Sequence, residues 1–290
     1  MDWQRDISHF LETILKKPVS IQSVSAIGGG SINIAYRVET NQGQFFIKMN
    51  SASRFPKMFE KEALGLEVLF DAGEIPVPEV IAVGENKKDA FLILKFIHSG
   101  SRRTSFWDDF GIGLARLHKH SQPVFGFSHD NYIGSLSQIN KEHESWDKFF
   151  TEERLKPLIR LAFNNGKMEK EDLKAFEIFE KKIPEIFPVE PPALLHGDLW
   201  SGNFMADENG NAVIIDPAVY YGHREMDLGM SQLFGGFHAR FYEAYNEAYP
   251  LQPGWEKRLD FCNLYPLLVH LNLFGMSYLI EIRSVLNKFF

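Results

Sequence analysis

Residues 193–227 read ALLHGDLWSGNFMADENGNAVIIDPAVYYGHREMD, and this stretch decides the fold. A short apolar run leads into the HGD motif at residues 196–198, and Asn203 follows five residues after the aspartate of that motif. A turn rich in Asp, Asn and Gly precedes a second apolar run, which ends on Asp216 because Pro217 cannot continue a strand. We therefore expect two acids and one amide at the ends of a short hairpin. Phosphoryl transfer uses such a set: one carboxylate takes the proton of the attacking hydroxyl, while an amide and a second carboxylate hold magnesium on the phosphates.

A glycine-rich loop near the N-terminus is expected to approach the phosphates of a nucleotide. Residues 19–27 and 33–40 read as strands, and three glycines lie between them. Glycine lets backbone N–H groups come close to a phosphate. For such a loop taken in isolation, a simple hairpin turn is the alternative interpretation. The loop comprises Gly28, Gly29, Gly30 and Ser31.

Lys48 lies in an otherwise apolar strand, residues 44–48, which is the third strand counted from the glycine loop. A solvent-facing lysine is the ordinary interpretation, but protein kinases place their phosphate-binding lysine on this strand. The next segment, residues 55–71, reads as a helix that offers three glutamates as partners of this lysine: Glu60, Glu62 and Glu67. Glu62 adjoins the apolar stripe of the helix and is the predicted partner, because an ion pair would hold the lysine charge in place.

The remaining pattern predicts an α+β molecule of two lobes. Five strands and one main helix make up a first lobe over residues 1–98, and helices dominate a second lobe over residues 99–290. Residues 98–101 form the expected hinge, and Pro266 marks an expected kink or break in the last helical region. An adenine ring at the hinge would contact the main chain through the carbonyl of Lys95 and the N–H of Ile97.

The composition is that of an ordinary soluble globular protein, with 44% hydrophobic and 24% charged residues. A net charge of −7 argues against a nucleic acid or a membrane surface as partner, since either would favour a basic patch. The single cysteine, Cys262, excludes an internal disulfide. No signal peptide is recognisable, and no run approaches the ~18 apolar residues that span a bilayer. The expected compartment is the cytoplasm.

The motifs HGDLWSGN, IIDPA, YGHREMDL and GGGSINIAY resemble the fructosamine (ketosamine) kinase family, which is related to aminoglycoside phosphotransferases and choline kinases. The resemblance extends to LLVHLNLFG near the C-terminus and implies a protein-kinase-like two-lobe fold. It further implies ATP-dependent phosphorylation of the sugar 3-hydroxyl of a ketosamine, with Mg²⁺ as cofactor and release of the amine afterwards. The ketosamine could be a ribulosamine, erythrulosamine or fructosamine, free or protein-bound. The alternatives are an aminoglycoside- or choline-type phosphotransferase and an inactive nucleotide-binding scaffold.

The resemblance implies a role for each matching residue. Asp198 would orient and deprotonate the attacking hydroxyl. Asn203 and Asp216 would bind Mg²⁺, and Lys48, held by Glu62, would grip the phosphates of ATP beneath the glycine loop. The remaining roles concern the acceptor and the support of the catalytic loop: Trp200 and His270 for the former, His196 and Asp227 for the latter. For Trp200 and His270, an ordinary place in the core is the alternative.

Overall fold

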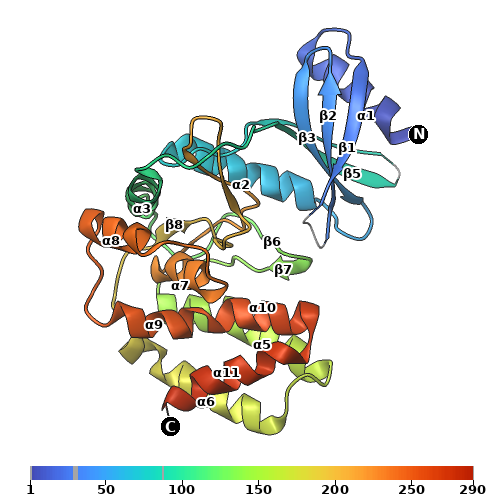
Figure 1. Ribbon diagram of the computed structural model, residues 1–290. Helices are drawn as coiled ribbons and strands as arrows, with labels where there is room; N and C mark the ends of the chain where they lie inside the picture. The colour runs from blue at the N-terminus through green and yellow to red at the C-terminus, as the bar shows by residue number, and fades with distance from the viewer. Residues whose placement is uncertain (1, 29–31, 87, 290) are drawn as a thin grey trace. The chain divides into compact units, whose positions relative to one another are not determined.

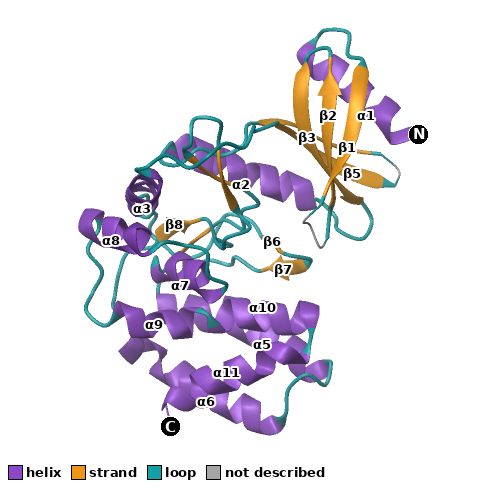
Figure 2. Ribbon diagram, viewed as in Figure 1, coloured by secondary structure: helices purple, strands orange, loops and turns teal. Residues whose placement is uncertain are grey.

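The computed structural model describes residues 2–28, 32–86 and 88–289 (Figure 1). Antiparallel strands dominate the N-terminal part of the chain and helices dominate the rest (Figure 2), which confirms the predicted α+β class. None of the helices in these residues combines the length and the apolar character that crossing a membrane requires.

The chain divides into two compact units. The first comprises Met1–Arg103 together with Met205–Ile215, and the second comprises Thr104–Phe204 together with Asp216–Phe290. The sequence-based division at residues 98 and 99 differs from these units in one respect. Residues 99–103 and the hairpin residues 205–215 group with the first unit, although the sequence assigns them to the second lobe.

The first unit is built on a five-stranded antiparallel sheet with the strand order β1-β2-β3-β5-β4. Its strands and helices are α1 Asp2–Leu15, β1 Ile21–Ile27, β2 Ile34–Thr40, β3 Gly43–Ser51, α2 Met58–Ala72, β4 Val80–Glu85 and β5 Asp89–Lys95. Five strands and one main helix after β3 are what the sequence predicts, and the N-terminal helix α1 packs on the same sheet.

The two faces of this sheet carry different layers. Ile7 and Leu11 of α1 pack against the face that holds Ile47, whereas α2 packs its buried residues against the face that holds Leu92 and Leu94. Successive side chains of a strand alternate between faces, so Lys48, next to Ile47, is directed to the side of α2. The alternation therefore places the lysine where a helix glutamate can reach it.

The second unit is mostly helical. Its helices are α3 Phe106–Leu117, α4 Trp146–Phe149, α5 Lys156–Asn164, α6 Lys170–Ile186, α7 Glu225–Leu233, α8 Ala239–Ala248, α9 Trp255–Cys262, α10 Leu264–Phe274 and α11 Leu279–Leu286, with a π-helical turn Phe150–Leu155 and 3₁₀ turns Met276–Tyr278 and Asn287–Phe289. Its short strands are β6 Asn131–Ile133, β7 Leu136–Gln138, β8 Ala193–Leu195 and β11 Tyr220–Gly222. Strand β6 pairs with β7, and β8 pairs with β11.

The predicted hairpin is formed by β9 Phe204–Ala206 and β10 Ala212–Ile214. The segment expected as a hinge is hydrogen-bonded to it: Gly100 N donates to Ala206 O at 3.0 Å and Arg103 N donates to Gly210 O at 3.3 Å. A side chain at Gly100 would overlap the carbonyl oxygen of Asp207, so glycine is required for this approach. These bonds account for the grouping of the hairpin with the first unit.

The C-terminal helical region is interrupted at other positions than expected. Pro266 lies in the first turn of α10, where a helix tolerates proline because the N–H it lacks has no partner in the helix. The breaks fall instead at Asn263, between α9 and α10, and at Gly275, whose φ of 106° ends α10. The expected interruption is therefore present as a break, but it falls at Asn263 and not at Pro266.

Candidate phosphotransfer site

The loop that carries the HGD motif is held by Asp227 of α7. One carboxylate oxygen, Oδ2, accepts from His196 N at 2.8 Å, and the other, Oδ1, accepts from Gly197 N at 2.9 Å. His118 at the end of α3 donates to Oδ2 through Nε2 at 3.3 Å. Burial by itself would raise the pKa of Asp227, but the His118 contact and the Gly197 N–H lower it below the usual range. Asp227 is thus an ionised, buried anchor of the loop.

Gly197 gives the loop its shape. Its φ is +83°, in the left-handed region that favours glycine, and a Cβ there would overlap the carbonyl oxygen of Ala218. Ala218 N also donates to His196 O at 2.9 Å, so the two segments run side by side. The glycine therefore lets the chain turn sharply after β8 and present Asp198 at the exit of the turn.

Asp198, Asn203 and Asp216 converge in the second unit. Asn203 is buried, and its amide Nδ2 donates to the backbone oxygen of Asp198 at 2.8 Å and to the carboxylate Oδ2 of Asp198 at 3.0 Å. The same nitrogen lies 3.5 Å from the backbone oxygen of Asp216. Asp216 has a φ of 55°, an uncommon left-handed conformation that aspartate tolerates better than most residues, and it turns the chain before Pro217.

The donor set of this cluster fits a magnesium ion. Because Nδ2 of Asn203 is used by the bonds to Asp198, its other amide atom, the oxygen Oδ1, is the one that could coordinate a metal. Magnesium prefers oxygen ligands and is commonly bound by one or two carboxylates together with substrate phosphates and water. Oδ1 of Asn203 and the carboxylate of Asp216 match that preference.

In the first unit, Lys48 pairs with Glu62. Nζ lies 2.7 Å from Glu62 Oε1, and the two side chains are 7% and 11% exposed. Of the three glutamates considered from sequence, Glu62 is thus the one that the structure brings to Lys48. Loss of either partner would break a largely buried ion pair, which is destabilising.

The other nucleotide-side positions stay predictions. Gly29, Gly30 and Ser31 lie outside the described residues, whereas Gly28 is described and has open space where a side chain would project. Lys95 is the last residue of β5, and Ile97 follows two residues later. Their main-chain contacts with an adenine ring are not tested.

A narrow pocket of about 20 Å³, room for a water molecule, adjoins Asp198. It lies within the second unit, and His270, Tyr265 and Asp227 are among its lining residues. The two predicted acceptor residues are connected through a third, Phe234. Its ring centroid lies 6.1 Å from Trp200 and 4.8 Å from His270. Sequence reasoning missed Phe234, because a phenylalanine just after a helix carries no functional signal.

Trp200 lies two residues after Asp198, and its ring lies against Gly202. A Cβ on Gly202 would overlap that ring, so the glycine of the SGN triplet leaves the space that the indole occupies. The indole is half-buried and meets the Phe234 ring nearly edge-on, with an interplanar angle of 78°. Trp200 and Phe234 thus form an aromatic pair, and Trp200 lies two residues after Asp198 in the chain.

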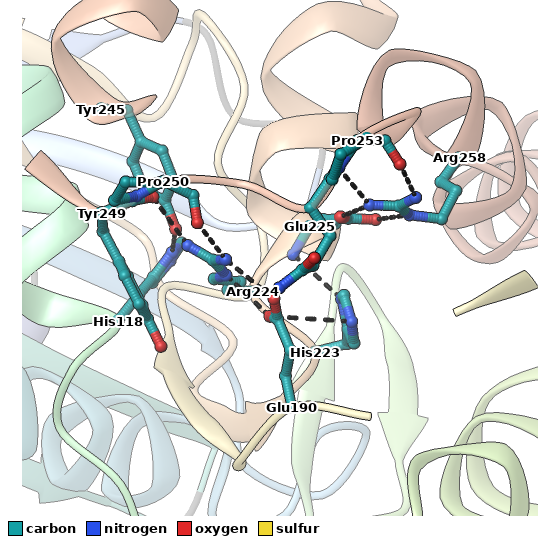
Figure 3. Close-up of polar contacts among 11 residues, drawn as sticks. His118, Glu190, His223, Arg224, Glu225, Tyr245, Tyr249, Pro250, Pro253 and Arg258 are labelled. Atoms are coloured by element: carbon teal, nitrogen blue, oxygen red, sulfur yellow. Dashed lines mark hydrogen bonds and ion pairs between the residues drawn. The ribbon is translucent and has the colours of Figure 1, made fainter. Parts of the chain in front are cut away.

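A buried polar network surrounds the start of α7 (Figure 3). Arg224 donates to both carboxylate oxygens of Glu190 at 2.7 and 2.8 Å, and its guanidinium lies 3.8 Å from the ring centroid of Tyr249. Arg258 binds both oxygens of Glu225 at 2.8 and 2.6 Å. The two ion pairs thus hold Arg224 and Glu225, two consecutive residues at the start of α7. This helix also carries Asp227.

His118 links Asp227 to the helices around the start of α7. Nδ1 of His118 lies 2.8 Å from the hydroxyl of Tyr245 on α8, while Nε2 donates to Asp227. His118 and Glu190 are supporting residues that the sequence analysis missed, because their partners lie 109 and 34 residues away along the chain. Only the folded chain reveals such pairs.

Solved structures of phosphotransferases share the fold of this chain. An aminoglycoside phosphotransferase in ternary complex with AMP-PNP and hygromycin B has a TM-score of 0.61 and 15% identity, and the match covers 98% of this chain and 98% of that chain. At this identity the likeness concerns the fold alone, and it confirms the predicted protein-kinase-like class.

Other known proteins have a higher sequence identity to this chain. A structure described as a candidate fructosamine-3-kinase of Thermobifida fusca has a TM-score of 0.87 and 32% identity, and the match covers 97% of both chains. The protein-ribulosamine 3-kinase, chloroplastic, of Arabidopsis thaliana is 40% identical over 278 residues, which are 94% of this chain and 84% of that relative. The family model described as fructosamine kinase matches residues 3–290. The chain belongs to the fructosamine kinase family.

Proposed function

We propose that this protein is a ketosamine kinase that transfers the γ-phosphoryl group of ATP to the 3-hydroxyl of a ketosamine. Membership of the fructosamine kinase family and the 40% identity to a protein-ribulosamine 3-kinase support the substrate class. The observation that carries the proposal is the convergence of Asp198, Asn203 and Asp216 on a loop fixed by Asp227. The AMP-PNP bound by the aminoglycoside phosphotransferase of the same fold supports ATP as donor.

Each residue of the site has a defined task in this proposal. Asp198 accepts the proton of the 3-hydroxyl as its oxygen attacks the γ-phosphorus and ADP departs. Oδ1 of Asn203 and the carboxylate of Asp216 hold Mg²⁺, which neutralises charge on the phosphates when it is bound. Lys48 contributes a further positive charge toward the phosphates, and its ion pair with Glu62 keeps that charge in place.

Phosphorylation at the 3-hydroxyl would make the adduct unstable. The phosphate is a good leaving group, so the phosphorylated ketosamine breaks down and sets the amine free. The proposed role is therefore the removal of sugar adducts from amines. A cytoplasmic location is part of the proposal; its support is the single cysteine, Cys262, which is buried as a free thiol.

A panel of acceptors tests the proposal. The protein with Mg·ATP is given ribulose-lysine, fructose-lysine, kanamycin or choline, and ADP release is measured for each. We expect turnover with a ketosamine and none with kanamycin or choline. Turnover with kanamycin or choline alone would identify an aminoglycoside- or choline-type kinase instead. Thermal stabilisation by Mg·ATP without ADP release on any acceptor would indicate a nucleotide-binding scaffold.

A further inference from the structure

The protonation pattern of His270 is fixed by its own helix. Nδ1 lies 2.7 Å from the backbone oxygen of Pro266, one turn earlier in α10. A carbonyl oxygen can only accept, so Nδ1 must carry the proton and donate it. In a neutral imidazole the other nitrogen, Nε2, then bears a lone pair and can only accept. Burial lowers the pKa of His270, although the Pro266 contact opposes this, and the neutral ring is therefore the form present near pH 7.

The accepting nitrogen is available to a ligand. Among the described residues, Nε2 has no hydrogen-bond partner, and it is not sealed from solvent as the unpartnered buried atoms of the molecule are. His270 lines the pocket that Asp198 also lines. An accepting atom in a pocket next to the proposed base calls for a donor group on the substrate.

Three aromatic rings fix the plane of this imidazole. The centroids of Phe234, Phe274 and Tyr278 lie 4.8, 5.3 and 5.1 Å from that of His270. Phe234 is 40% exposed and also contacts Trp200 edge-on. Aromatic faces attract cations by about 0.5–2 kcal/mol, so the surroundings of Nε2 favour a donor that is positively charged.

We propose that Nε2 of His270 accepts a hydrogen bond from the secondary ammonium of the ketosamine, with Phe234 and Trp200 as the aromatic wall beside that nitrogen. The inference rests on the proposed function and names the group that selects its substrate. In a ketosamine the ammonium nitrogen and the 3-oxygen are separated by four bonds, or about 5 Å when extended. Asp198 and His270 line the same pocket, so a ketosamine bound at the mouth of that pocket can meet both side chains.

This arrangement predicts a specific selectivity. A hydrogen bond to a charged group contributes about 1.5–3 kcal/mol, so the ketosamine should be preferred over its 1-O-alkyl ether analogue by ~10–100-fold in kcat/KM. The ether has no N–H to donate. A quaternary ammonium analogue keeps the charge but lacks the donor, so it should lose the part of the preference that the hydrogen bond contributes.

The test compares the amine and its ether analogue in four proteins. In the wild type the amine is preferred. His270→Phe keeps a ring without a lone pair and should abolish the preference, mainly through a higher KM for the amine. His270→Gln offers an accepting oxygen and should restore most of the preference. His9→Phe makes the same change at an exposed histidine of α1 and should leave the selectivity as it is.

The outcomes separate the inference from the function on which it rests. If His270→Phe lowered turnover of both substrates equally, or if the preference for the amine persisted in it, the role of His270 would be wrong while the kinase assignment stood. If the wild type phosphorylated neither compound, the proposed function itself would fall. A ¹⁵N spectrum of the wild-type histidines gives an independent reading: we expect a neutral Nδ1–H ring for His270 and a shift of Nε2 when a 3-deoxy ketosamine binds. An Nε2–H ring or an unmoved Nε2 signal would overturn the inference.

Discussion

At the scale of single residues, the structure assigns different atoms of one side chain to different tasks. Asn203 uses its amide nitrogen to bind Asp198 and so turns its oxygen to the place where magnesium is proposed. Because one of these bonds goes to the backbone oxygen of Asp198, the loop keeps a tie to Asn203 even when the carboxylate is removed. A mutation can therefore remove the carboxylate of Asp198 without removing the bond that holds the loop to Asn203.

Asp198→Ala is expected to lower kcat by ~10²–10⁴-fold, the usual contribution of a positioned base, while the Kd for Mg·ATP changes little. Single-turnover phosphorylation and calorimetric titration with the nucleotide measure the two quantities. Near-normal turnover in the variant would show that Asp198 is not the base.

At the scale of elements, the catalytic loop depends on α7 as much as on its own residues. Both carboxylate oxygens of Asp227 are occupied by N–H groups of the loop, and the entry of α7 is held by the pairs Arg224–Glu190 and Arg258–Glu225. The HGD motif is thus positioned from outside the hairpin that separates the other two site residues, Asn203 and Asp216.

Asp227→Asn is expected to lower both stability and turnover. An amide presents an NH₂ group where the carboxylate accepts two N–H groups, and each buried N–H left without a partner costs about 1–3 kcal/mol. Urea unfolding should show this loss of free energy, and kcat should fall with it. Glu185→Gln, which alters an exposed helix pair, is the matched control and should change neither. An Asp227→Asn protein of wild-type stability would contradict the anchoring role.

The elements that local patterns define were predictable, and the ones that distant contacts define were not. The place of Lys48 on the third strand after the glycine loop, and a glutamate beside an apolar stripe, led to the pair of Lys48 and Glu62. The motif around Asp198 and Asn203 led to the site. The position of the break near Pro266 was not predicted, because the effect of a proline depends on whether it lies in the first turn of a helix or in its interior. The sequence pattern does not define where the helix begins. The grouping of the hairpin with the first unit depends on backbone hydrogen bonds from residues 99–103. No local sequence pattern predicts these bonds.

At the scale of the whole molecule, stability should depend on pH through a buried histidine. His223 is fully buried, and its Nδ1 accepts from Glu225 N at 3.3 Å, which requires the neutral ring (Figure 3). Burial lowers the pKa of His223 below 6.5, although Glu225 and Glu190 oppose this. The unfolded chain therefore binds a proton below pH 6.5 that the folded chain does not, so stability falls as the pH drops through this value.

Between pH 7.5 and 5.5, the free energy of unfolding should decrease, with a contribution from His223 of up to about 1.4 kcal/mol per pH unit below 6.5. His223→Gln removes the titrating group and should flatten the profile, although His270, whose pKa is also lowered, will retain a part of the slope. Urea unfolding at the two pH values measures the difference. An equal slope in wild type and variant would exclude His223 as its source.

One hydroxyl of one class of substrate, the 3-hydroxyl of a ketosamine, is proposed to receive the phosphoryl group. The most direct measurement is the position of the phosphate in the product formed from ribulose-lysine and Mg·ATP, read from phosphorus–proton couplings by NMR. We predict a phosphate on the 3-oxygen, followed by the appearance of free lysine. A stable product that carries its phosphate on another oxygen would contradict the account.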